Sequence, residues 1–292
     1  MQPNRTFLFA PGNHPRKVEK VFDAGADAVI LDLEDAVAIS EKPATRAVVV
    51  EALQKPRRCR GYVRVNALDT DFCFEDIDAV VAEGVDGIIL PKVERAADLQ
   101  MVDWMMTGLE QRRGLTPGGI DLVPIIETGR GIADVRAIAG AGIARMKRLS
   151  FGAGDYTRDM GMEWTLEEAE LAPYQAEVVL ASRINDLEPP LDTVFIHIRE
   201  EAAFARSCAR VKNMGFQGKL CIHPVQIAAA NAAFTPTEEE TAFARKVIAE
   251  FAKAEAAGSA SIQIDGYFVD YPIVVKAERI VALADAVANA QR

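Results

Sequence analysis

Short apolar segments alternate with amphipathic helical segments along most of the chain. Within each short segment the apolar residues are continuous rather than alternating, which is typical of parallel strands buried on both faces. Helical periodicity separates most of these segments, for example over residues 15–24 and 74–83. We predict strands at residues 6–10, 28–33, 61–66, 87–93, 121–127, 148–152, 193–198 and 218–223.

This series of strand–helix units predicts an α/β fold of the (β/α)8 TIM-barrel type. A length of 292 residues suits a single barrel with an addition. The alternative is an open doubly wound sheet, which usually carries a glycine-rich fingerprint after its first strand. Ala10-Pro11-Gly12-Asn13 is not such a fingerprint. We therefore expect a catalytic barrel over residues 1–234 and a helical extension over residues 235–292.

The extension departs from the strand–helix pattern. Thr235 or Thr237 is suited to cap a long alanine-rich helix that reaches about residue 257. A small-residue break follows at 258–261, and a last helix is predicted from 273 to about 290.

Composition and charge exclude several classes of function. The formal net charge of −10 makes the chain a poor nucleic-acid binder, so an anionic substrate would need a metal or a local basic pocket. No apolar run approaches the roughly 20 residues that span a bilayer, and the N-terminus does not resemble a signal peptide. We expect no membrane partner and a cytoplasmic location. The cysteines are scattered, which indicates reduced thiols: Cys59, Cys73, Cys208 and Cys221.

Two carboxylates end neighbouring predicted strands. Chemistry in a TIM barrel lies at the carboxyl ends of the strands. Glu127 ends the fifth strand, and Asp155 follows the sixth within Gly152-Ala153-Gly154-Asp155. Two carboxylates with open coordination positions suit Mg²⁺, or Mn²⁺ in its place, and no histidine pair or thiolate cluster favours zinc. The glycines let backbone amides of Ala153 and Gly154 approach a bound anion.

Further charged residues end other strands. Asp32, Glu34 and Asp35 follow the second strand, either as part of the barrel mouth or as an ordinary acidic helix start. Arg64 lies within the third strand, either in a structural ion pair or as a group that binds an anion. Lys92 ends the fourth strand. We favour an ion-paired lysine there over a Schiff-base lysine.

Two histidines and a basic cluster are weaker candidates. His223 ends the eighth strand and is equally suited to a structural hydrogen bond and to the role of a base. His14 lies in the first loop, beside Arg16, Lys17 and Lys20. This cluster suits a phosphate but is also ordinary on a helix surface.

Several motifs together resemble the citrate lyase β-subunit group of the HpcH/HpaI aldolase superfamily, which includes malyl-CoA and citramalyl-CoA lyases. The resemblance runs from Arg5 to the final helix. Its motifs are residues 5–12, 25–37, 90–94, 126–128, 151–156 and 218–224.

This resemblance implies a metal-dependent lyase. Mg²⁺ would bind Glu127 and Asp155, and Arg64 would contact the substrate, with Glu34 and Asp35 forming the family's acidic turn. Asp270 would be the acid that relatives place over a neighbouring subunit's site. The first-loop residues Arg16, Lys17 and Lys20 would lie near the nucleotide of coenzyme A. Such proteins are usually trimers or hexamers.

The expected reaction joins or cleaves a carbon–carbon bond between a thioester and a 2-keto acid, with Asp270 as the base. Two departures put substrate choice in doubt, namely His197 where many relatives have an acid, and the turn at residues 188–191. One alternative is a citrate lyase β subunit acting on an acyl-carrier-protein thioester. Another is a non-catalytic acyl-CoA or dicarboxylate binding protein, and a third is a metal-free Schiff-base aldolase using Lys92.

Overall fold

The computed structural model describes residues 3–290. Contacts divide the chain into two compact units: a barrel unit, Asn4–Asn231, and a tail unit, which contains Pro3 and the described residues from Ala232 onward.

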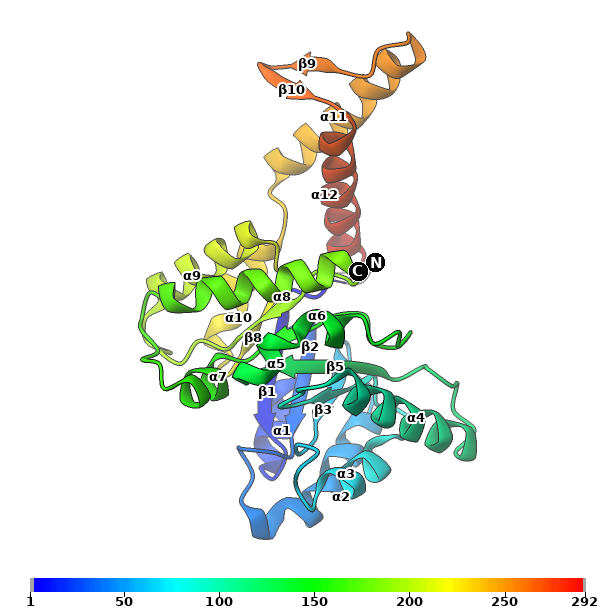
Figure 1. Ribbon diagram of the computed structural model, residues 1–292, viewed down its shortest axis with the longest axis vertical. Coiled ribbons are helices and arrows are strands. Elements are labelled where there is room, and N and C mark those ends of the chain that lie inside the picture. The colour runs from blue at the N-terminus through cyan, green and yellow to red at the C-terminus, as the bar shows by residue number, and fades with distance from the viewer. Residues whose placement is uncertain (1–2, 291–292) are drawn as a thin grey trace. The chain divides into compact units, whose positions relative to one another are not determined.

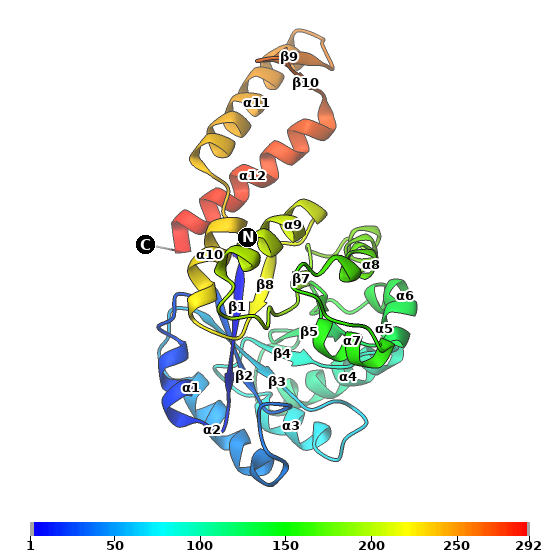
Figure 2. The same cartoon turned by 90° about the vertical axis from the view of Figure 1, so that its left-hand side faces the viewer.

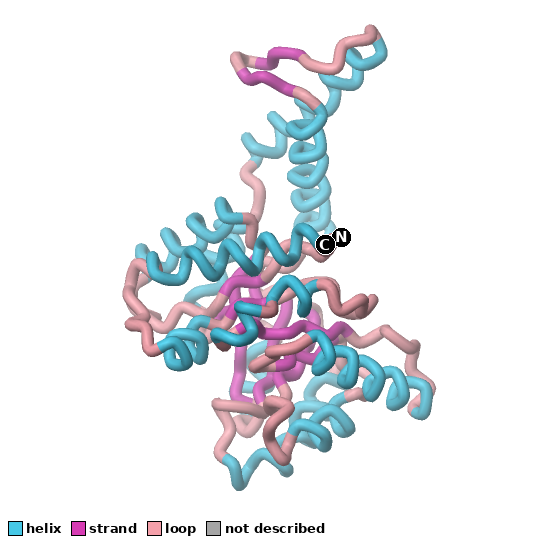
Figure 3. Tube along the Cα trace, viewed as in Figure 1, coloured by secondary structure: helices cyan, strands magenta, loops and turns pink. Residues whose placement is uncertain are grey.

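The barrel unit is a closed parallel barrel surrounded by helices, as Figure 1 and Figure 3 show. Strands pair in chain order, and β1 pairs with β8 through Leu8 and Cys221 to close the ring. This confirms the predicted TIM barrel and excludes the open sheet. The strands are β1 (Thr6–Pro11), β2 (Ala28–Asp32), β3 (Arg60–Arg64), β4 (Gly87–Leu90), β5 (Asp121–Ile126), β6 (Ser150–Phe151), β7 (Leu191–Asp192) and β8 (Gly218–Cys221).

The barrel interior is filled with large apolar side chains, including Phe7, Ile30, Tyr62, Val123 and Leu220. Such filling makes the barrel a packed core, so chemistry is left to the loops at its carboxyl end. Helices cover the outside. They are α1 (Pro15–Val21), α2 (Lys42–Gln54), α3 (Cys73–Val80), α4 (Ala96–Arg112), α5 (Gly129–Ala133), α6 (Val135–Ala139), α7 (Ala153–Met160), α8 (Ala172–Ile184), α9 (Glu201–Met214) and α10 (Val225–Phe234), with 3₁₀ turns η1 (Ile39–Glu41) and η2 (Ala169–Leu171).

The predicted seventh strand at residues 193–198 is wrong. The strand is Leu191–Asp192, and the residues after it form a loop. The predicted strand began at Thr193 and left Asp192 outside it, and an unpaired charge is costly to bury in a strand. In the structure Lys219 of β8 and Gln175 of α8 satisfy its carboxylate, and both members of the ion pair are completely buried.

The tail unit is a helical hairpin with a small β-ribbon at one end (Figure 2). Helices α11 (Glu238–Ala256) and α12 (Tyr271–Ala290) lie side by side, and β9 (Ile262–Ile264) pairs antiparallel with β10 (Tyr267–Val269). Thr237 caps α11 and forms a reciprocal capping box with Glu240, as predicted for that threonine.

The β-ribbon was not predicted. Its turn is Asp265-Gly266, and both residues have positive φ, +49° and +85°. Asp-Gly is a strong hairpin signal, because a two-residue turn of this kind needs left-handed backbone at both positions. No helix in the described residues combines the length and the apolar composition of a membrane-spanning segment.

Candidate functional site

Arg64, at the end of β3, forms the centre of an ion-pair network at the barrel mouth. Its guanidinium pairs with both oxygens of Asp32, at 2.7 and 2.6 Å, and Nη1 lies 2.9 Å from Glu34 Oε2. Asp35 Oδ2 is 3.7 Å from the same nitrogen. Asp32 is the last residue of β2, and the other two acids follow that strand directly. The acidic segment therefore turns into the mouth rather than forming a surface helix start.

Asp32 was a candidate for the mouth in the sequence, but no role was assigned to it. Besides Arg64, its carboxylate accepts the backbone N–H groups of Glu34 and Ala36 at 3.0 and 3.1 Å. Burial acts to raise the pKa of Asp32, but Arg64 and these N–H groups hold it below the ordinary value. Asp32 thus stays ionised and fixes both the arginine and the acidic turn. Its place at the carboxyl end of a buried strand was the signal that made it a candidate.

Lys42 supports the same turn from α2. Its ammonium donates to the carbonyls of Leu33 and Glu34, at 2.9 and 2.6 Å, and to Asn66 Oδ1 at 2.7 Å. A buried lysine is costly unless its donors are satisfied, so this arrangement indicates that the turn has one fixed shape. No sequence motif pointed to Lys42.

Lys92 links the acidic turn to the two candidate metal ligands. Its backbone N–H donates to Glu127 Oε1 at 2.9 Å, while its ammonium pairs with Glu34 and lies 3.6 Å from Asp155 Oδ2. Burial acts to lower the pKa of Lys92, but Glu34 and Glu127 raise it above the ordinary value. A lysine that stays protonated is a poor Schiff-base nucleophile, so the geometry favours the ion-paired interpretation.

Glu127 and Asp155 thus come together at Lys92 from the ends of β5 and β6. Glu127 is nearly inaccessible, and burial together with Glu34 and Asp155 raises its pKa to about 8. The Glu127 carboxylate fills the space where a side chain of Gly152 would begin, since a Cβ built there would lie 2.4 Å from Oε2. Gly152 is therefore required for this carboxylate to reach the mouth.

The acids of the network supply only oxygen donors: Asp32, Glu34, Asp35, Glu127 and Asp155. The cations facing them are Arg64, Lys42, Lys92 and Arg158. The oxygen-only donors fit Mg²⁺. Within the described residues no cluster of three or more histidine, cysteine or carboxylate groups is arranged to hold a metal. A site with two protein carboxylates would leave its other positions to water and substrate.

Backbone donors lie beside these acids at the start of α7. Thr193 Oγ1 accepts the Ala153 N–H at 2.8 Å and so ties this turn to the loop after β7. The next N–H groups, beginning with Gly154, belong to the first helical turn, which offers no intrahelical acceptor. The helix dipole also favours an anion there, so Gly154 can receive a substrate carboxylate.

The remaining predicted site residues lie outside this network. Arg16, Lys17 and Lys20 are exposed on α1, which follows β1 at the same end of the barrel. His223 is exposed after β8, and its Nδ1 accepts the Val225 N–H at 3.2 Å, which fits the structural interpretation.

Two other predicted positions lie in loops. His197 is half-buried in the loop after β7 and packs edge-on against Phe195. Asp270 immediately precedes α12 in the tail unit. Its carboxylate has no hydrogen bond or ion pair within residues 3–290, so it remains available to a partner.

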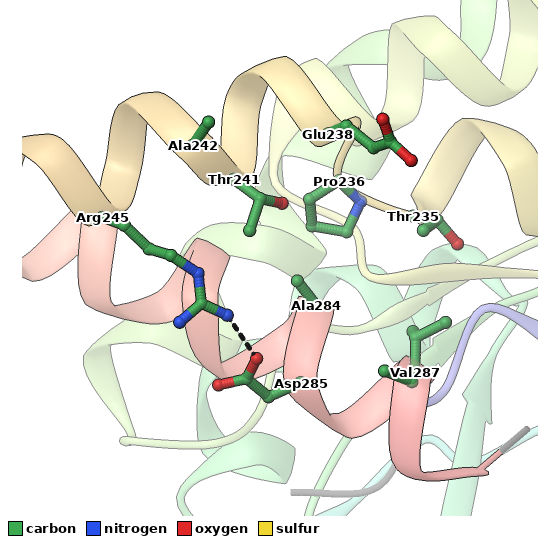
Figure 4. A pocket seen from close by; sticks show the side chains of 10 residues that line it. Thr235, Pro236, Glu238, Thr241, Ala242, Arg245, Ala284, Asp285 and Val287 are labelled. Atoms are coloured by element: carbon green, nitrogen blue, oxygen red, sulfur yellow. Dashed lines mark hydrogen bonds and ion pairs between the residues drawn. The ribbon is translucent and has the colours of Figure 1, made fainter. Parts of the chain in front are cut away.

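A cavity of about 440 Å³ in the tail unit lacks comparable chemistry (Figure 4). An ion pair between Arg245 and Asp285 crosses it, and small side chains such as Ala242 and Ala284 form much of its lining. None of the predicted site residues lines it, so the barrel mouth remains the candidate site.

Comparison with known proteins shows which family the chain resembles. Residues 5–224 match the family described as HpcH/HpaI aldolase/citrate lyase. The chain is 37% identical to the citrate lyase subunit beta of Leuconostoc mesenteroides subsp. cremoris over 97% of this chain and 93% of that protein. It is 35% identical to the L-malyl-CoA/beta-methylmalyl-CoA lyase of Cereibacter sphaeroides, over 98% of this chain and 96% of that one.

A solved structure is also similar over nearly the whole chain. Protein CitE from Mycobacterium tuberculosis, in complex with magnesium, acetoacetate and coenzyme A, superposes with a TM-score of 0.77 at 27% identity, covering 97% of this chain and 98% of that one. With the family match spanning the whole barrel and curated relatives spanning nearly the whole chain, the protein belongs to the HpcH/HpaI aldolase/citrate lyase family.

Proposed function

We propose that the protein is a Mg²⁺-dependent carbon–carbon lyase that cleaves a 3-hydroxyacyl-CoA into an acyl-CoA and a 2-keto acid. The observation that carries the proposal is the convergence of Glu127 and Asp155 on Lys92, beside an arginine, at the barrel mouth. Relatives with malyl-CoA lyase activity, and a similar structure that contains magnesium and coenzyme A, support the same class of reaction.

Each group would have a definite task. Glu127 and Asp155 would hold Mg²⁺, or Mn²⁺ in its place, and the bound cation would polarise the carbonyl of the keto acid. Arg64 has N–H groups left beyond those used on Asp32 and Glu34, so it can also donate to the substrate. The Gly154 N–H would orient the substrate carboxylate, whereas the Ala153 N–H, which the sequence also suggested, is already donated to Thr193 Oγ1.

Cleavage breaks the bond between C2 and C3 of the hydroxyacyl chain. The electron pair of that bond moves to C2 of the thioester, the 3-hydroxyl gives its proton to water, and C3 becomes the carbonyl of the keto acid. Asp270 would donate a proton to C2 and regain one from water, and in condensation it would remove the C2 proton as a base. Arg64 would stabilise the negative charge that develops on the thioester.

We further propose that residues 235–292 bring Asp270 to the site of a neighbouring subunit in a homotrimer or hexamer. Asp270 lies in the tail unit and lacks an ionic partner there, which suits a group that acts elsewhere. The exposed Arg16, Lys17 and Lys20 would contact the coenzyme A nucleotide. Their charge and their position after β1 support that role.

The decisive experiment removes the metal ligands separately. Glu127→Gln and Asp155→Asn should each lower Mg²⁺-dependent cleavage of malyl-, citramalyl-, methylmalyl- or citryl-CoA at least a hundredfold. The matched control is Glu177→Gln, which neutralises a carboxylate on the outside of α8 and should change nothing. Retained activity in both ligand variants would refute the site.

Citrate lyase β-subunit function is the second candidate, and the similarity to the Leuconostoc subunit favours it. In that case the substrate would be a citryl thioester on an acyl carrier protein. The purified chain is given CoA thioesters and carrier-protein thioesters in parallel. The products show which thioester it cleaves and so distinguish the CoA-thioester lyase from the citrate lyase β subunit. A non-catalytic binding protein would bind these thioesters without cleaving any of them.

A further inference from the structure

We propose that Lys92 is a positioning residue that fixes Glu34, Glu127 and Asp155 relative to one another. The inference rests on the proposed function, because Glu127 and Asp155 are the residues assigned there to the metal. It assigns to one lysine two separate tasks, one for its backbone and one for its ammonium group.

The backbone of Lys92 adopts a conformation that lysine rarely takes. Its φ is +53°, in the left-handed region where a Cβ is sterically unfavourable. In this conformation the Lys92 N–H donates to Glu127 Oε1 at 2.9 Å. The turn after β4 therefore holds a carboxylate that belongs to β5. Strain of this kind persists where the surrounding structure requires it, and it clusters at functional sites.

The ammonium group reaches acids from two other loops. It pairs with Glu34 from the turn after β2, and it lies 3.6 Å from Asp155 Oδ2 in α7 and 4.0 Å from Asp35 Oδ2. Its side chain is 23% exposed, so the attraction is only partly screened by solvent. Three segments of the mouth, β2–η1, β5 and α7, thus contact a single residue.

The backbone task and the side-chain task favour different residue types at position 92. A positive φ favours glycine, which would keep the N–H and remove the strain. Only a long cationic side chain reaches Glu34 and Asp155 from this position. Lysine is a compact charge with several donors, so it can serve two carboxylates that approach from different directions. Its presence at this strained position indicates that the ammonium is needed there.

The test measures metal binding without substrate. Full-length protein is titrated with Mn²⁺, and free Mn²⁺ is followed by electron paramagnetic resonance. Lys92→Met should weaken Mn²⁺ binding about 10- to 100-fold, the usual cost of losing a group that orients metal ligands. Lys147→Met is the matched control, because Lys147 pairs with Asp121 at the opposite end of β5. That control should bind Mn²⁺ like the wild type.

Other outcomes decide against the proposal. Unchanged binding by Lys92→Met would show that the ammonium positions nothing, and tighter binding would show that it merely repels the cation. If the methionine variant does not fold, Lys92→Gly replaces it, since glycine relieves the strain and keeps the N–H to Glu127. The glycine variant should show the same loss of Mn²⁺ affinity.

Chemical rescue separates the charge from general damage. Lys92→Cys treated with 2-bromoethylamine regains an ammonium on a side chain of lysine length, and it should recover most of the lost affinity. Treated wild type controls for modification of Cys59, which is half-buried. Complete modification without recovery would overturn the proposal. Wild type that binds no Mn²⁺ would overturn the metal site itself, whereas an unaffected Lys92→Met variant would overturn only the role of Lys92.

Discussion

Lys219 and Asp192 form a completely buried ion pair on the outer side of the barrel sheet, where Gln175 of α8 donates to the same carboxylate at 2.7 Å. Their strand neighbours Leu220 and Leu191 point the other way and fill the barrel interior. Alternation along each strand thus places the charges under a helix rather than in the mouth. The pair is therefore a structural part of the barrel and is not part of the candidate site.

We predict that Lys219→Met will lower the free energy of unfolding by about 3–5 kcal/mol, because Asp192 then remains buried without its counter-ion. The double variant Asp192→Leu, Lys219→Met should recover most of that loss, since it removes both charges. Urea unfolding measures both effects. Equal losses in the single and double variants would contradict this account.

The Lys219–Asp192 pair also shows why the role of a single charged residue could not always be predicted from the sequence. Asp155, Glu127 and Arg64 could be selected because charged groups at the ends of apolar strands point to the barrel mouth. Asp192 also ends a strand, β7, yet its side chain is fully buried in an ion pair outside the barrel mouth. The difference depends on Lys219, which is distant in sequence and whose contact only the register of β7 with β8 creates.

At the scale of elements, Glu110 joins α4 to the strands that follow it. Arg145, just before β6, pairs with both oxygens of Glu110 at 2.7 Å, and the N–H groups of Gly118 and Ile120 donate to the same carboxylate at 2.8 and 3.2 Å. Burial acts to raise the pKa of Glu110, but these partners hold it below the ordinary value of 4.5.

A lowered folded-state pKa gives stability that is present above the unfolded pKa and lost as pH falls through the folded one. We therefore expect Glu110→Gln to be less stable than the wild type at pH 7. The difference should shrink as pH falls below about 4.5. Unfolding free energies of both proteins between pH 7 and pH 3 test this. A difference that does not vary with pH would show that the charge of Glu110 is not responsible.

The β9–β10 ribbon depends on its two-residue turn. Gly266 has a φ of +85°, so Gly266→Ala should destabilise the ribbon by about 1–2 kcal/mol. Asp265→Gly is the matched variant, because it relieves strain at the neighbouring left-handed position while losing an ion pair of 2.7 Å with Lys246. Hydrogen exchange of the ribbon amides should be faster in the alanine variant than in the glycine variant. The reverse order would contradict the turn argument.

The strand–helix units and the long tail helices could be predicted from local periodicity, and the count of eight units predicted that the sheet closes into a barrel. The ribbon was also encoded locally, by Asp265-Gly266, but its strands of three residues are too short for a periodic signal. The role of Lys92 could not be predicted in this way. It depends on a backbone angle and on acids from three distant segments.

At the scale of the whole molecule, the proposed exchange of tails between subunits predicts complementation. Glu127→Gln should lack a working metal site but carry a normal tail, and Asp270→Asn should be the converse. Each variant alone should be inactive. If Asp270 acts on a neighbour, co-expression should restore activity, because a barrel from one variant then receives the tail of the other.

The control is a mixture of the two variants after each has been expressed and purified separately. This mixture should stay inactive until subunits exchange between the assemblies. Restoration is measured as cleavage of the thioester per mole of mixed assembly. Co-expressed variants that form mixed assemblies yet remain inactive would show that Asp270 serves its own barrel or has no catalytic role. Unchanged exchange of thioester methyl protons in Asp270→Asn alone would exclude Asp270 as the base.

The absence of a side chain at Gly152 indicates how a single substitution could abolish activity in this fold. A single methyl group at that position would overlap the Glu127 carboxylate and the side chain of Ile125, whereas the barrel closes through the pairing of β1 with β8. We expect one substitution here to displace Glu127, the proposed metal ligand, while the barrel still closes. Homologous chains with any side chain at this position should be binding proteins or inactive paralogues, however similar the rest of their sequence remains.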